Sequence, residues 1–130
     1  MGPVKFASFL HGRLAFFYEL NEGVKNMNAK TIRFYGFMTK LEREFYALEN
    51  RGGISKSAIR RITDYESWFK AIAADPEYAA VSEQGLVTID VFCELAGAFN
   101  AKKPRKEIDS IIFRLAAAIN ALVRRKLHGI

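Results

Sequence analysis

The chain has little cysteine and no long uninterrupted apolar run. Cys93 is the only cysteine among 130 residues, which excludes an internal disulfide framework and a cysteine-based zinc site. The longest apolar stretch, 111–123, contains Arg114 and Asn120 and is too short to span a bilayer. No small-residue cleavage site follows the first apolar residues. The sequence therefore predicts a cytoplasmic protein without a membrane partner.

Catalytic and metal-binding patterns are also missing. No glycine-rich stretch fits a phosphate-binding loop, and neither His11 nor His128 has a metal-ligand neighbour at helical spacing. Asp90 and Glu94 are four residues apart and share a helix face, which is typical of a solvated surface. Cys93 lies between them without a histidine that would activate a thiol. We predict a protein that is not an enzyme and that uses no metal and no cofactor.

Apolar and aromatic residues are abundant and recur at helical spacing. Half of the residues are apolar and 11 are phenylalanine, as in a packed core. The pattern predicts an all-α fold over residues 1–130, as a single helical domain. We expect a compact bundle of about five to six helices, with long helices in the N-terminal third and at the C-terminus.

The expected helices are separated by glycine and proline. The first runs over 4–27, and the second has a stripe that continues to Leu48 and ends at Gly52-Gly53. Ser55 opens a short third helix to Ile62. A short helix over 77–85 should end in a turn at Gly85, and another should start at 88 or 90. The last helix spans 105–128, and its second face, around Phe113, is apolar as well.

The charge is unevenly distributed. The net charge is +6, yet residues 75–100 hold five acidic and no basic residues, while 101–130 carry eight basic and two acidic ones. One basic cluster surrounds Arg51 and the Gly-Gly turn, and another flanks the last helix at both ends. Such clusters neutralise phosphates, which predicts a nucleic-acid partner, DNA or RNA. The expected contacts are Lys56, Arg60, Arg61, Lys102, Lys103, Arg105, Lys106, Arg124 and Arg125.

Residues 53–62, with the sequence GISKSAIRRI, resemble the turn and recognition helix of a helix-turn-helix DNA-binding motif. The resemblance implies a DNA-binding regulator in which Ser55, Lys56, Ser57 and Arg60 face the major groove. The preceding half departs from that pattern, because Glu49 and Gly52 stand where a small and an apolar residue are expected. The helix before the turn is also long rather than short.

A second resemblance is architectural. A small, basic helical bundle of this length is similar to the small subunits of CRISPR effector complexes, and small phage-encoded inhibitors share its size. The first resemblance implies a subunit of a larger nucleoprotein complex that contacts phosphate and associates with other subunits or with itself. The alternative is a protein-interaction module or inhibitor that acts through the second face of the last helix. The residues expected in that interface are Phe113, Ala117 and Ala121.

Overall fold

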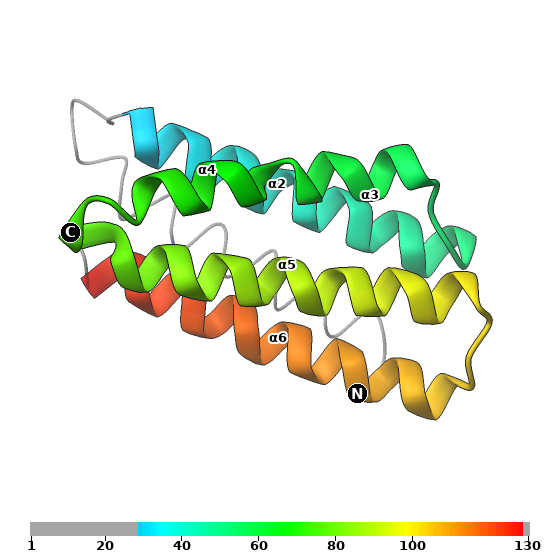
Figure 1. Ribbon diagram of the computed structural model, residues 1–130. Helices are drawn as coiled ribbons and strands as arrows, with labels where there is room; N and C mark the ends of the chain where they lie inside the picture. The colour runs from blue at the N-terminus through cyan, green and yellow to red at the C-terminus, as the bar shows by residue number, and fades with distance from the viewer. Residues whose placement is uncertain (1–28, 129–130) are drawn as a thin grey trace.

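The computed structural model describes residues 29–128, with side chains up to Lys126, and within that range it contains helices and no strand (Figure 1). This confirms the all-α prediction. The helix expected over 4–27 lies outside the described residues. The elements are α2 (Ala29–Arg51), α3 (Lys56–Thr63), α4 (Tyr65–Ile72), the 3₁₀ helix η1 (Pro76–Tyr78), α5 (Ala79–Asn100) and α6 (Arg105–His128).

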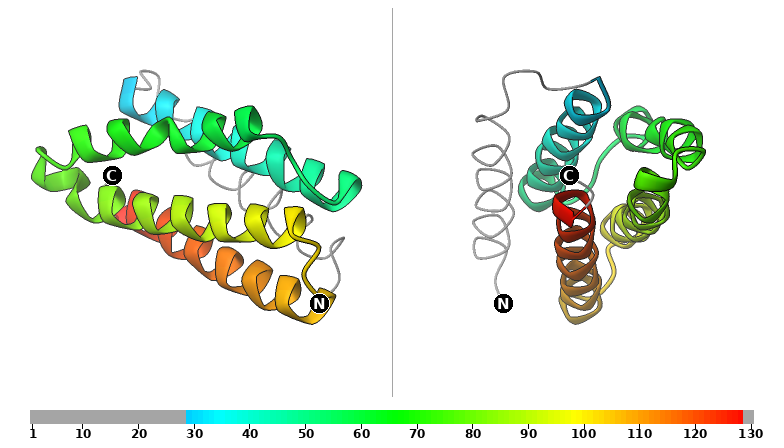
Figure 2. Two further views of the ribbon diagram at one scale, coloured as in Figure 1. Left: turned by 45° about the vertical axis from the view of Figure 1, so that its right-hand side comes forward. Right: turned by 90° about the vertical axis from the view of Figure 1, so that its left-hand side faces the viewer.

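Within residues 29–128 the helices form four arms, so this part of the chain does not support the expected count of five to six. Asp64 alone separates α3 from α4, and its backbone stays helical (φ −60°, ψ −21°), with its amide donating to the Arg60 carbonyl at 2.8 Å. The two short helices therefore follow one another as one arm. This arm, α2, α5 and α6 enclose a common core (Figures 1 and 2).

The boundaries of α2 follow from its sequence. The apolar stripe is fully buried, as predicted; its members are Phe34, Phe37, Met38, Leu41, Phe45 and Leu48. Gly52 ends the helix in the left-handed conformation (φ 76°), and its amide donates to the Leu48 carbonyl at 2.8 Å. Glu44 is charged yet only 4% exposed, because its spacing from Leu41 and Leu48 places it within the stripe.

The predicted turn at Gly85 does not exist, because α5 continues from Ala79 to Asn100. Gly85 is buried in the helix, and the Phe69 ring of α4 occupies the space where a Cβ atom would lie. The glycine therefore permits close packing of two helices rather than a chain reversal. The helix end predicted at Gly85 is therefore absent, and the helices expected on either side of it are one helix.

The last helix has the predicted bounds, 105–128, and α5 packs along it. Its inward stripe is buried, whereas Phe113 on the other face is 65% exposed. The described part of the chain holds no helix with the length and apolar character needed to cross a membrane.

Candidate nucleic-acid interface

Asn100 joins two turns that are far apart in sequence. Its Oδ1 accepts a hydrogen bond from the Ile54 amide at 3.0 Å, and its Nδ2 donates to the Ile54 carbonyl at 3.1 Å. These bonds hold the α2–α3 turn against the C-terminus of α5, so the α2–α3 turn and the α5–α6 loop lie at the same end of the bundle (Figure 1). The two basic clusters of the sequence thus meet in part.

Five exposed cations gather at this end, which we call the basic end. No ion pair to any of them occurs among residues 29–126. They come from the end of α2, the start of α3, the α5–α6 loop and the start of α6. The basic end consists of Arg51, Lys56, Lys102, Lys103 and Lys106.

The α5–α6 loop places its two lysines at a helix C-terminus of defined geometry. The Lys103 amide donates to the Ala98 carbonyl and the Lys102 amide to the Phe99 carbonyl, both at 3.0 Å, which is the Schellman arrangement. Lys102 adopts a left-handed backbone (φ 53°), a conformation that usually falls to glycine. The loop thus holds a charged side chain at a position where glycine would be conformationally cheaper.

Two of the predicted contacts are engaged by carboxylates. Arg61 lies 3.5 Å from Glu44, and Arg105 bridges Glu49 at 3.1 Å and Asp109 at 2.8 Å. Arg60, the residue before Arg61 on α3, is exposed. Since both guanidinium groups are partly neutralised, Arg61 and Arg105 tie helices together and offer less free charge than the sequence indicated.

Arg124 and Arg125 do not join the basic end. Both are exposed near the far end of α6. At about 1.5 Å per residue, Arg124 lies roughly 28 Å along the helix from Arg105. Arg124 and Arg125 therefore lie on a surface separate from the basic end.

The acidic residues of the segment 75–100 do not pair with the predicted contacts among the described residues. Within the described residues, Asp75 pairs with Lys30 at 3.0 Å and Glu94 with Arg114 at 2.6 Å, and neither cation belongs to the predicted set. The hydrogen bond from Lys30 lowers the pKa of Asp75. Among the described residues, no carboxylate of residues 75–100 forms an ion pair with a cation of the basic end.

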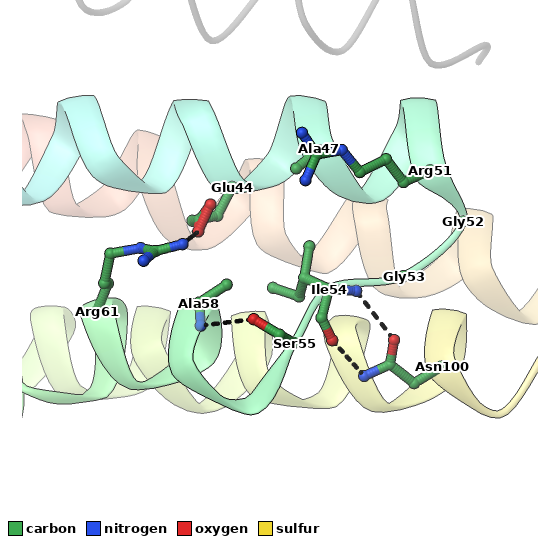
Figure 3. Close-up of a pocket in the computed structure, with 10 residues that line it drawn as sticks. All are labelled: Glu44, Ala47, Arg51, Gly52, Gly53, Ile54, Ser55, Ala58, Arg61 and Asn100. Atoms are coloured by element: carbon green, nitrogen blue, oxygen red, sulfur yellow. Dashed lines mark hydrogen bonds and ion pairs between the residues drawn. The ribbon is translucent and has the colours of Figure 1, made fainter.

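A pocket of about 420 Å³ opens between α2 and α3 beside the basic end (Figure 3). The Arg51 guanidinium turns back along α2 beside Ala47, and the Arg61 guanidinium points to Glu44. The Glu44 carboxylate is buried, and its Oε2 accepts no hydrogen bond. Two guanidinium groups against one carboxylate leave a surplus positive charge, which suits a small anionic group such as a phosphate.

The path of the chain does not support the resemblance of residues 53–62 to a helix-turn-helix motif. Ser55 caps α3 by accepting from the Ala58 amide at 3.2 Å, as such a motif would require. However, α3 runs back alongside α2 as an antiparallel hairpin (Figure 1), whereas the motif needs a steep crossing. Lys56 and Arg60 are exposed, but no short supporting helix crosses behind them in the described chain.

The predicted partner residues lie together on α6. Phe113 and Ala117 are exposed and Ala121 is half-buried. A shallow groove of about 410 Å³ flanks Phe113 and is lined also by Lys106, Ser110 and Arg114. Sequence reasoning found this face from its apolar character.

No catalytic arrangement is apparent among the described residues. Burial, together with the charges of Glu66 and Asp90, raises the pKa of the Cys93 thiol, which keeps it protonated and weakly nucleophilic. No group of three His, Cys, Asp or Glu residues between 29 and 126 is arranged to hold a metal ion. His11 and the side chain of His128 lie outside the described residues.

Two residues that organise this site were missed from the sequence. Glu44 carried a signal, because it interrupts an apolar stripe at helical spacing. Asn100 carried none, since its partner is 46 residues away.

Compared with protein-family models, with curated proteins and with solved structures, the chain matches none of them.

Proposed function

We propose that this chain is a non-enzymatic protein that holds the phosphate backbone of a nucleic acid at the basic end. The observation that supports it is the convergence of exposed cations without carboxylate partners from segments about fifty residues apart. Two other cations of the described chain, Lys30 and Arg114, are instead paired with carboxylates. Lys102 adds support. A lysine with a positive φ is less stable than a glycine would be, and backbone strain of this kind is concentrated at functional sites.

Binding of this kind is electrostatic and insensitive to sequence. Each phosphate that a cation neutralises releases condensed counterions, so affinity falls as salt rises. Five contacts correspond to a slope of about −4.5 in log K against log salt for a duplex. The Arg51–Arg61 pocket would seat one phosphate of the same backbone, with Glu44 orienting Arg61.

The salt slope tests the proposal directly. In fluorescence anisotropy with a random-sequence duplex, we expect Lys102→Gln/Lys103→Gln to reduce the slope by about 1.8, because two counterion-releasing contacts are lost. The matched control is Arg43→Gln/Lys70→Gln, which removes the same charge from exposed positions on α2 and α4. An equal reduction by the control, or no binding at low salt, would contradict the proposal.

Membership of a larger nucleoprotein complex is the second part of the proposal. A backbone-binding protein of this size, with an exposed aromatic face on α6, suits a subunit that lies along a nucleic acid beside others. Copurification of a defined nucleoprotein complex with the tagged chain, lost on nuclease treatment, is the expected result.

The competing proposal is a protein-interaction module that uses Phe113 and Ala117. The specific observation in its favour is the 65% exposure of Phe113, the most exposed of the large apolar side chains described. This role predicts no nucleic-acid binding at low salt. Sedimentation of the chain with and without Phe113→Ser then measures whether that face drives association.

A further inference from the structure

One continuous stripe, exposed except at the half-buried Ala121, runs along α6. Its members follow at spacings of four, three, four, four and three residues, which places them within about 80° of the helix surface. The stripe begins at the basic end and reaches the Arg124–Arg125 cluster about 27 Å further along. The exposed α6 stripe consists of Lys106, Ser110, Phe113, Ala117, Ala121 and Arg124.

The order of chemistry along this stripe is cation, aromatic ring, cation. Lys106 and Arg124 stand at its ends, and the small residues Ser110 and Ala117 on either side leave the Phe113 ring open. No carboxylate belongs to the stripe, and the neighbouring Asp109 is paired with Arg105 at 2.8 Å. The surface is therefore apolar at its centre and positive at both ends.

A second copy of the chain does not fit this surface. An antiparallel pair of α6 helices centred between Phe113 and Ala117 would set Lys106 of each copy against Arg124 of the other. A parallel pair would set each cation against itself. Like charges facing each other disfavour both arrangements, so the charge pattern favours a polyanion as occupant.

The exposed ring distinguishes between forms of nucleic acid. In a duplex the base faces are stacked on one another and a flat side chain on a helix surface cannot reach them. In a single strand each base has a free π-face that stacks on an aromatic side chain. We infer that α6 binds single-stranded nucleic acid, with Phe113 stacked on a base and with Lys106 and Arg124 contacting phosphates on either side.

This inference rests on the proposed function and adds the form of nucleic acid and the residue that recognises it. At the roughly 3.4 Å per nucleotide of a stacked strand, about 27 Å between the two cations corresponds to about 8 nucleotides, and an extended strand needs fewer. The probe is therefore oligothymidylate of about 12 nucleotides, compared with the same oligomer annealed to its complement.

Replacement of the ring is the decisive change. We expect Phe113→Ala to weaken binding of the single strand by about 5- to 150-fold, the range for loss of one stacked base, with duplex binding within about twofold. Phe113→Trp should retain the affinity and show additional fluorescence quenching on binding. Val87→Ala, which truncates an exposed apolar residue on α5, is the control and should change neither affinity.

The outcomes separate this inference from the proposed function. Equal loss of single-strand and duplex binding in Phe113→Ala, or no loss of either, overturns the stacking role, while the salt slope of Lys102→Gln/Lys103→Gln still decides backbone binding. If the parent chain binds neither probe, both proposals fail. Association of the parent chain that Phe113→Ala abolishes would then assign the stripe to a protein partner. Unfolding midpoints establish that each variant is folded.

Discussion

At the residue scale, Lys126 is a buried cation that the basic sequence does not distinguish from its neighbours. It is 4% exposed, its ammonium lies 5.3 Å from the centre of the Tyr78 ring, and no carboxylate pairs with it among residues 29–126. Burial lowers its pKa. The ring contact offsets part of the desolvation of the charge.

This burial makes the contribution of Lys126 to stability dependent on pH. Because the pKa is lower in the folded state than in the unfolded state, the charged lysine destabilises the fold fully below the folded pKa. The effect fades between that pKa and the ordinary lysine value. We expect Lys126→Met to raise the urea midpoint at pH 7 and the difference to shrink as the pH approaches 10. Lys70→Met, at an exposed position, should show no such gain.

At the scale of elements, the two glycines of α5 have opposite roles. Gly85 faces the Phe69 ring, which occupies the position of a Cβ atom, whereas a Cβ at the exposed Gly97 would meet nothing within 4 Å. We expect Gly85→Ala to lower the free energy of unfolding by about 1–3 kcal/mol through overpacking. Gly97→Ala should raise it by about 0.5–1 kcal/mol through helix propensity. Chemical denaturation measures both, and equal effects would contradict this packing.

At the scale of the whole molecule, Asn100 connects the two turns that form the basic end. We expect Asn100→Ala to lower the free energy of unfolding by about 1–2 kcal/mol, since two hydrogen bonds to Ile54 are lost at an exposed site. The amide of Ile54 should also exchange faster with solvent. Asn50→Ala, which removes an exposed amide at the end of α2, serves as the reference. Unchanged exchange at Ile54 would show that other contacts hold the turns together.

Local patterns predicted the elements better than their assembly. The stripe from Phe34 to Leu48, the Gly52 stop and the bounds of α6 depend on periodicity and capping, which are properties of neighbouring residues. The helix predicted to end at Gly85 failed because the reason for that glycine, Phe69, lies in another helix. The same contrast between local pattern and long-range contact holds for the candidate site. Charge clusters were visible in the sequence, but their grouping depends on Asn100 and on the pairing of Arg61 and Arg105.

The contact between Phe69 and Gly85 also limits how α4 and α5 can be aligned. If α5 slid by one helical turn, Val81 or Ile89 would replace the glycine beneath the ring and its side chain would collide with it. Alternative registers of this helix pair are thereby disfavoured, whatever apolar area they bury. A residue without a side chain thus helps to select one native arrangement from several that bury similar apolar area. It does so by raising the energy of the competing arrangements rather than by lowering that of the native one.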